Sequence, residues 1–305
     1  MLELLNKAYE NNKKYVKYGS VADYIPALSK ANPNDLGICV STLDGNEYYV
    51  GDYNKKFTIQ SMSKILTLML ALMDNGEEKV FSLVGAEPTG DSFNSITNLE
   101  VKDLHKPYNP MINAGAILTT SLIKGKNHQE KIERILSFAK KLSNNNDITI
   151  NQNAYLSEKE TGDRNRALAY FMKSYNSLSG NVDEILDIYF TQCSMEVTCQ
   201  DIARIAAVLA NDGILPWSKE DVIPRDICRI TKTIMTTCGL YDASGDFAMH
   251  VGIPSKSGVG GGILSSVPKK MGIGVYGPSL DKKGNSIAGV EILKELSEEL
   301  NLSIF

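Results

Sequence analysis

The chain has 305 residues, of which 43% are hydrophobic and 22% are charged, and its formal net charge is -4. This composition is ordinary for a globular protein and argues against a largely disordered chain. No dense basic run interrupts the mildly acidic sequence, so a nucleic-acid partner has no electrostatic support.

The N-terminal part is expected to form a helix and then a strand hairpin. The first residues, MLELLNKAYENNKK, are amphipathic and predict a helix that stops by about Gly19. They lack the basic-then-apolar order of a signal peptide, which favours a cytoplasmic protein. Residues 36–42 and 47–50 read as two strands joined by a turn that contains Asp44 and Gly45.

The middle of the chain is expected to be mostly helical. Residues 61–72 are apolar on every side, which predicts a fully buried helix. A helical period runs through residues 132–142 and again through 202–209, where Thr198 is a candidate N-cap and Gly213 a stop signal. A further helix is expected over residues 224–237.

The C-terminal third returns to strands. Residues 263–267 and 271–275 suggest a hairpin, and residues 288–300 a closing helix. Short loops between strands imply an antiparallel sheet. We therefore expect an α+β fold, a single domain over residues 1–305. Its antiparallel sheet comes from both chain ends, with N- and C-terminal helices packed on it and a helical lobe inserted at roughly 62–237.

Metal, membrane and disulfide chemistry receive little support. The histidines His105, His128 and His250 lie far apart, and no clustered Cys/His spacing is present. The strongest apolar run, Ile65 to Met73, is too short to cross a bilayer. The scattered cysteines contain no C-x-x-C pair and resemble buried free thiols of a reducing compartment. They are Cys39, Cys193, Cys199, Cys228 and Cys238. No metal or organic cofactor is expected.

Serine chemistry has a better signal. No G-x-S-x-G elbow is present, and Gly258 to Gly262 fits neither nucleotide-binding glycine motif. An S-x-x-K pattern places a serine and a lysine on one helix face, where the lysine can activate the hydroxyl. We favour Ser61-Met-Ser-Lys64 because it opens the fully buried helix. The same pattern also starts at Ser121, Ser137, Ser266 and Ser279.

A second element strengthens this choice. Lys256-Ser257-Gly258 occurs once, before an expected strand, as K-[ST]-G does in penicillin-binding proteins and β-lactamases. Taken alone, it is more simply interpreted as a surface turn. The order and separation of the two elements make a joint serine-hydrolase interpretation better than either alone.

A series of ordered blocks runs between roughly Tyr15 and Ile292. The blocks are Val21-Ala-Asp-Tyr-Ile-Pro26, Gln60-Ser-Met-Ser-Lys64, Val84-Gly-Ala-Glu-Pro88, Asn109-Pro-Met-Ile-Asn-Ala-Gly-Ala116, Ser157-Glu-Lys-Glu-Thr-Gly-Asp-Arg-Asn165, Tyr189-Phe190 before Cys193-Ser-Met-Glu-Val197, Cys238-Gly-Leu-Tyr-Asp242 and Lys256-Ser-Gly-Val-Gly-Gly-Gly262. In these blocks the chain resembles the bacterial and mitochondrial-type glutaminase family. The resemblance implies a β-lactamase/DD-peptidase-like fold and a homodimer or homotetramer. The S-D-N element of β-lactamases is missing, which speaks against penicillin chemistry.

The resemblance also implies a reaction and a site. L-Glutamine and water would give L-glutamate and ammonia through a glutamyl ester on Ser61, with Lys64 as the activating partner. Tyr241 would shuttle a proton, and the backbone N–H groups of Ser61 and Val259 would form an oxyanion hole. The substrate pocket would be lined by Tyr24, Asn113, Glu158, Asn165 and Tyr189.

Two questions stay open at this level. The runner-up functions are another serine amidase or penicillin-interacting protein of the same fold, and a catalytically dead amino-acid-binding module. The general base is either Lys64 or Tyr241. Lysine acts as a base near neutrality only if its site lowers the reference pKa, about 10.4, by roughly three units.

Overall fold

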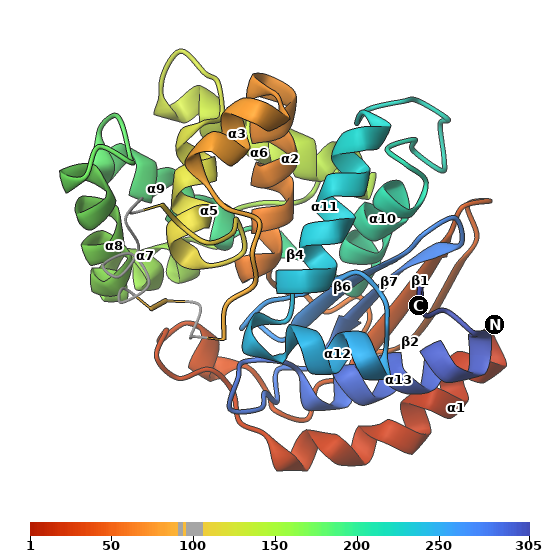
Figure 1. Ribbon diagram of the computed structural model, residues 1–305. Coiled ribbons are helices and arrows are strands. Elements are labelled where there is room, and N and C mark those ends of the chain that lie inside the picture. The colour runs from red at the N-terminus through yellow and green to blue at the C-terminus, as the bar shows by residue number, and fades with distance from the viewer. Residues whose placement is uncertain (91–93, 96–105) are drawn as a thin grey trace.

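The centre of the molecule is an antiparallel sheet of five strands in the order β2-β1-β7-β6-β5. The computed structural model describes residues 1–90, 94–95 and 106–305 (Figure 1). The strands are β1 (Gly37–Thr42), β2 (Glu47–Gly51), β5 (Ser255–Ser257), β6 (Gly262–Val267) and β7 (Met271–Tyr276). Both chain ends therefore build the sheet, and the predicted hairpins β1–β2 and β6–β7 are confirmed.

The terminal helices cover one face of the sheet (Figure 1). They are α1 (Leu2–Asn12) and α13 (Ile287–Leu300). The short helix α12 (Ser244–His250) packs on the same face. Alternation along the strands explains the packing, because Ile38, Val40, Ile273 and Val275 share one hydrophobic cluster with these helices. The first helix ends earlier than expected, and a 3-10 segment, Lys13–Tyr18, carries the chain to Gly19.

Helix α10 (Cys199–Ala210) covers the opposite face of the sheet. The predicted N-cap is present as a capping box, in which Thr198 and Asp201 bond reciprocally. Two glycines of β7 make the close approach possible. A Cβ on Gly272 would lie 2.1 Å from the Ala203 carbonyl oxygen, and one on Gly274 would lie 2.2 Å from the Cys199 carbonyl oxygen.

The remaining helices form the region inserted between the strands. They are α2 (Ser63–Asn75), α3 (Glu77–Leu83), α5 (Asn113–Ser121), α6 (His128–Ser143), α7 (Gln152–Thr161), α8 (Asp163–Ser174), α9 (Val182–Cys193) and α11 (Arg225–Cys238). A two-stranded sheet of β3 (Phe57–Thr58) and β4 (Glu196–Val197) lies among them. None of the helices in the described part of the chain is long and apolar enough to cross a membrane.

Helix α2 is the element that sequence patterning predicted most clearly. Every residue from Ser63 to Leu72 is buried. The start differs from the expected one, since Gln60–Met62 form a 3-10 turn and the α-helix begins only at Ser63. The left-handed backbone of Gln60, with φ +49°, forces this tighter turn at the helix entrance.

Candidate active site

Seven of the nine predicted site residues line one cavity of about 100 Å³, to which elements far apart in the chain contribute. They are Tyr24, Ser61, Asn113, Glu158, Asn165, Tyr189 and Val259. The other two, Lys64 and Tyr241, lie against this cavity, because Lys64 bonds to Asn113 and Tyr241 bonds to Ser61. The structure thus brings together the whole set that the sequence singled out.

Ser61 lies in the 3-10 turn that leads into α2 and is buried. The loop after β5 runs directly beside it. A Cβ on Gly258 would lie 2.9 Å from the Ile59 carbonyl oxygen and 3.5 Å from the Ser61 nitrogen. Only glycine allows this approach, so Gly258 brings the backbone next to Val259 up to the Ser61 backbone.

Lys64 is completely buried one turn after Ser61. Its Nζ donates to the Met111 carbonyl oxygen at 3.0 Å and to the Asn113 Oδ1 at 2.7 Å. Burial lowers the pKa of Lys64 to about 8, with Cys193 and Glu158 opposing the shift. A substantial fraction of the amine is therefore neutral close to physiological pH.

Tyr241 is held in an unusual backbone conformation, with φ +57°. Such a left-handed conformation is strained for a bulky residue. Ser244 holds it in place: its Oγ donates to the Tyr241 carbonyl oxygen at 2.8 Å and accepts from the Leu240 N–H at 3.0 Å. These two bonds stabilise the turn that places the Tyr241 ring beside Ser61.

The Tyr241 hydroxyl faces both the nucleophile candidate and the loop after β5. Burial raises the pKa of Tyr241 to about 12, while hydrogen bonds with Ser61, Ser257 and the Val259 N–H act in the opposite direction. The Val259 N–H thus lies within reach of the same small volume as the Ser61 hydroxyl. The Val259 N–H is therefore a candidate donor to an oxyanion that forms at this point.

Lys256 also lies at the site, and the sequence pointed to it only as part of the Lys256-Ser257-Gly258 motif. It is fully buried in β5, which corrects the surface-turn interpretation of Lys256-Ser257-Gly258. Its Nζ lies 4.3 Å from the centre of the Tyr241 ring and donates to the carbonyl oxygens of Gly239 and Ser257 at 3.0 and 2.7 Å. The K-S-G motif was the available signal for this contact.

Glu158 is the one buried carboxylate of its acidic segment. It is only 6% exposed, whereas Glu160 is exposed and the Asp163 side chain is 93% exposed. Burial raises the pKa of Glu158 to about 7, against a hydrogen bond with Gln60 and the charge of Lys64. Of these three acidic side chains, only Glu158 is removed from solvent and available to the cavity.

Amides complete the cavity wall opposite Ser61. Asn113 at the start of α5 accepts from Lys64 and donates through its Nδ2 to the Asn165 Oδ1 at 2.8 Å. Asn165 belongs to α8. Tyr189 of α9 is buried, while Tyr24 is exposed at the rim. The cavity thus offers a carboxylate, two amides and two phenols around one serine.

A metal site is not formed by the described residues, where no group of three or more His, Cys, Asp or Glu could hold an ion. His128 is exposed, and His250 lies near Asp246 on the surface. His105 lies outside the described residues. All five cysteines are buried free thiols.

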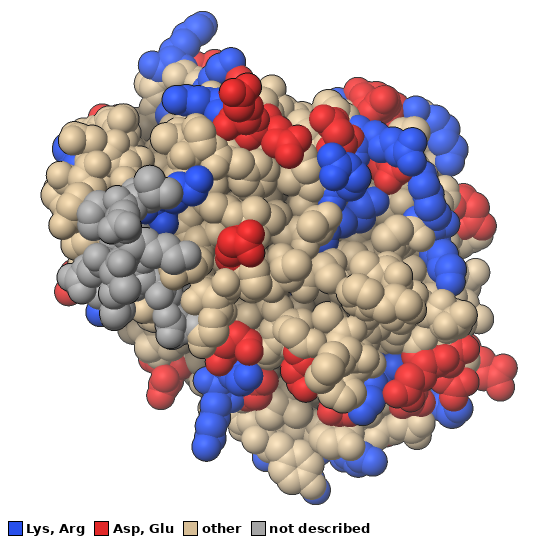
Figure 2. Space-filling model, viewed as in Figure 1, with Lys and Arg blue, Asp and Glu red and all other residues tan. Residues whose placement is uncertain are grey.

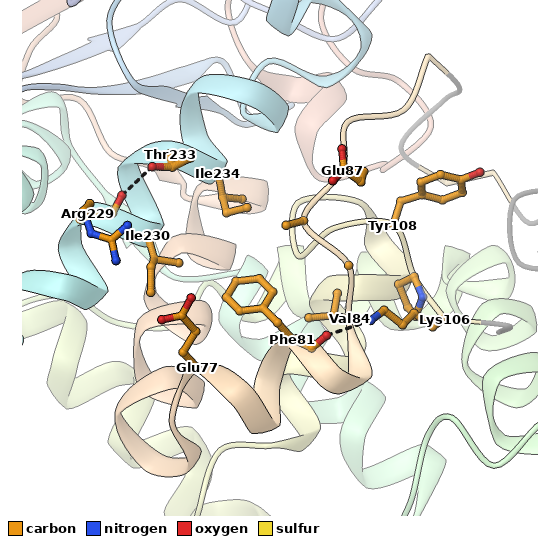
Figure 3. Close-up of a pocket in the computed structure, with 13 residues that line it drawn as sticks. Glu77, Phe81, Val84, Glu87, Lys106, Tyr108, Arg229, Ile230, Thr233 and Ile234 are labelled. Carbon is orange, nitrogen blue, oxygen red and sulfur yellow. Dashed lines mark hydrogen bonds between the residues drawn. The ribbon is translucent and has the colours of Figure 1, made fainter.

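A larger cavity, of about 600 Å³, lies elsewhere and contains none of the predicted site residues (Figure 3). Helices α3 and α11 form one side, with Phe81 and Ile230, and two stretches, residues 84–87 and 106–108, form the other. On the molecular face in Figure 2, basic side chains gather at the upper right among acidic ones, and the middle of the face is mostly uncharged apart from an isolated acidic group.

Comparison with known proteins identifies the fold and the chemistry. Residues 19–305 match the family model described as Glutaminase. The chain is 64% identical to Glutaminase 2 of Clostridium perfringens (strain 13 / Type A), with all of both chains covered.

Solved structures give the same result. The structure described as probable glutaminase ybaS has a TM-score of 0.96 and 37% identity, with 100% of this chain and 97% of that chain covered. The Bacillus subtilis glutaminase YbgJ, in covalent complex with 5-oxo-L-norleucine formed from 6-diazo-5-oxo-L-norleucine, has a TM-score of 0.91 and 41% identity over 100% and 99% of the two chains. These likenesses confirm the β-lactamase-like α+β fold that the sequence predicted. The chain belongs to the glutaminase family.

Proposed function

We propose that Ser61 is the nucleophile with which this glutaminase splits the side-chain amide of L-glutamine. The observation that carries the assignment is the meeting of a buried serine, a low-pKa lysine and a strained tyrosine at one cavity that also holds a buried carboxylate. The YbgJ complex supports it, because 6-diazo-5-oxo-L-norleucine, a glutamine-like reagent, forms a covalent bond with that protein.

Activation of the serine falls to Lys64 in this scheme. Its neutral amine takes the Ser61 proton while Ser61 Oγ bonds to the amide carbon, and Tyr241 carries a proton to the leaving nitrogen. The C–N bond breaks, ammonia leaves, and a glutamyl ester remains. Water then attacks the ester by the reverse proton path and releases L-glutamate.

Charge develops on the amide oxygen during both steps. The backbone N–H groups of Ser61 and Val259 are the proposed donors to this oxyanion. Gly258 supports the proposal, since its missing side chain allows the two backbones to approach. Burial lowers the pKa of Lys256 well below its ordinary value, so its role beside the Tyr241 ring is to donate hydrogen bonds to the Gly239 and Ser257 carbonyl oxygens.

The polar side chains that line the cavity would recognise the free amino acid. Glu158 would pair with the α-ammonium group, because a buried ammonium needs a negative partner. Asn113, Asn165, Tyr189 and Tyr24 would bind the remaining polar groups of glutamine. A generic amidase has no need for this buried carboxylate.

The test of the nucleophile is Ser61→Ala, measured as ammonia release from glutamine. The variant should fold normally and lose turnover, because no acyl-enzyme can form. Ser121→Ala is the matched control, since Ser121 opens another S-x-x-K pattern. Activity near that of the unmodified protein in Ser61→Ala, or its loss in Ser121→Ala, would overturn the assignment. Acylation by a β-lactam probe would instead favour the penicillin-interacting alternative, and binding of glutamine without ammonia release would favour the binding-module alternative.

Three further properties belong to this proposal. We infer a single domain over residues 1–305, a homodimer or homotetramer on the basis of the family resemblance, and a cytoplasmic location. The five free cysteines support the location, because reducing compartments preserve thiols. Sedimentation of the purified protein distinguishes monomer from dimer and tetramer.

A further inference from the structure

Asn109 is a buried amide that no step of the proposed reaction uses. It is 1% exposed and precedes the turn that leads into α5. Its Oδ1 accepts from the Met111 N–H at 2.9 Å and from the Ile112 N–H at 3.1 Å. Its Nδ2 donates to the Glu87 carbonyl oxygen at 2.8 Å. The side chain therefore ties three backbone groups of two segments together.

The turn that Asn109 closes carries both acceptors of the Lys64 ammonium. The Met111 carbonyl oxygen lies 3.0 Å from Lys64 Nζ, and Asn113 Oδ1 lies 2.7 Å from it. Because Asn109 bonds to the Met111 N–H, it fixes the peptide plane that precedes Met111, the residue whose carbonyl oxygen accepts from Lys64. A shift of this turn would carry both acceptors with it.

A second segment braces the same turn from outside. The Gly85 N–H donates to the Pro107 carbonyl oxygen at 2.7 Å, and the Glu87 N–H donates to the Tyr108 carbonyl oxygen at 3.0 Å. This segment also forms one wall of the larger cavity (Figure 3). Asn109 connects these two backbone stretches to the turn that carries the hydrogen-bond acceptors of Lys64.

Helix α5 packs against Asn109 without free space. A Cβ on Gly115 would lie 1.9 Å from the Asn109 carbonyl oxygen, so the Asn109 backbone sits directly on the helix. Loss of the side-chain bonds therefore cannot be absorbed by the Asn109 backbone moving toward α5. The turn itself would have to move.

We propose that Asn109 is a positioning residue for the hydrolysis, which holds the Met111–Asn113 turn so that Lys64 is aimed at Ser61. The inference rests on the proposed role of Lys64. Positioning errors of about 1 Å can cost as much as a hundredfold in rate. Asn109 does not itself line the cavity that receives the substrate, but the turn that it holds carries Asn113, which does. We therefore expect the larger loss in kcat, where both Lys64 acceptors act, and a smaller rise in KM through Asn113.

The experiment compares Asn109→Ala, Asn109→Asp and Asn75→Ala. Asn75 is the matched control, because its Nδ2 also ties α2 to the end of α5, through Ala71 and Leu122 carbonyl oxygens at 2.9 and 2.8 Å. Kinetics with glutamine and thermal melts are measured for each protein. The aspartate keeps the two acceptor bonds, so it tests rescue.

We expect Asn109→Ala to lose roughly ten- to a hundredfold in kcat, with a smaller rise in KM because Asn113 lines the substrate cavity. Asn109→Asp should recover at least half of the lost kcat on a logarithmic scale. Asn75→Ala should melt at a lower temperature yet keep kcat within about twofold. A folded Asn109→Ala protein with unchanged kcat, or an equal kcat loss in Asn75→Ala, would overturn the inference.

Two controls keep the outcome decisive. If Asn109→Ala does not fold, Asn109→Ser takes its place, and unchanged kcat in that folded variant overturns the inference. Lys64→Ala separates the two proposals. An active Lys64→Ala protein refutes the proposed reaction, whereas an inactive Lys64→Ala beside a fully active Asn109 variant refutes only the positioning role.

Discussion

At the scale of single residues, Lys64 and Glu158 have pKa values shifted toward each other by the same cause. Burial lowers the pKa of Lys64 to about 8 and raises that of Glu158 to about 7. Each group therefore changes protonation near neutrality, where neither would in water. Each of the two pKa shifts predicts an effect that enzyme kinetics can measure.

The Lys64 shift predicts how kcat/KM depends on pH. Only the neutral amine accepts the Ser61 proton, and it becomes the majority form above its pKa. Because this pKa belongs to the ligand-free protein, kcat/KM for glutamine should rise with pH and level off above about pH 8. The measurement is kcat/KM from pH 6 to 9.5, with melts to exclude unfolding. A kcat/KM that is flat over this range would show that Lys64 does not serve as the base.

The Glu158 prediction concerns substrate recognition. Glu158→Gln preserves shape and removes the charge, so glutamine should lose roughly a hundredfold or more in kcat/KM, mainly through KM. An amide of similar length without the α-amino group should lose far less, because it never offered the ammonium. Both substrates are measured with both proteins. Parallel losses would show that Glu158 is structural or catalytic.

Stability provides the control for that variant. The pKa of Glu158 in the folded protein is raised above its ordinary value, so its stabilising contribution is present at low pH and is lost as the pH rises through about 7. The Gln side chain of the variant does not ionise, so it makes no such pH-dependent contribution to stability. At pH 8, Glu158→Gln should therefore melt no lower than the unmodified protein, and its kinetic loss cannot be ascribed to unfolding.

At the scale of elements, the contact of β7 with α10 sets how the sheet supports the helical region. Glycine alternates along β7 with the apolar residues Ile273 and Val275. The glycines leave one face of the strand without side chains, and this smooth face lies toward α10, while Ile273 and Val275 pack on the terminal helices. The smooth face lets the α10 backbone lie directly on the strand.

This packing predicts that Gly274→Ala destabilises the protein. Its new methyl group would lie 2.2 Å from the Cys199 carbonyl oxygen, and the helix would have to move. We expect a loss of about 1–3 kcal/mol in the free energy of unfolding. Gly245→Ala in α12 is the matched control, since its Cβ would meet nothing within 4 Å, and it should be neutral or slightly stabilising. Denaturant unfolding of both variants checks this, and equal stabilities would contradict the packing argument.

At the scale of the whole molecule, periodicity and turn chemistry were sufficient for most of the fold. The buried helix α2, the hairpins and the capped α10 follow from local rules, as does a sheet built from both chain ends. The start of α2 could not be predicted, because Gln60 is left-handed at a place where its side chain bonds to Thr58 and to the distant Glu158. Local propensity does not report such overrides.

The active site shows the same division between what the sequence predicts and what only the structure reveals. The residues came from motifs and the family resemblance, while their electrostatics came only from the structure. Full burial of Lys256, the strained Tyr241 and the contrast between buried Glu158 and exposed Asp163 depend on which neighbours the fold supplies. Asn109 lay inside a recognised block, yet only its hydrogen bonds give it a function to test.

The central claim is that Ser61 forms the covalent bond to the substrate. The most direct measurement is to treat the protein with 6-diazo-5-oxo-L-norleucine and map the adduct by peptide mass spectrometry. One adduct should form, on Ser61, with loss of ammonia release in parallel, and an excess of glutamine should slow both. An adduct on Ser121, Ser137 or a cysteine, with the Ser61 peptide unmodified in the inactivated protein, would contradict the account.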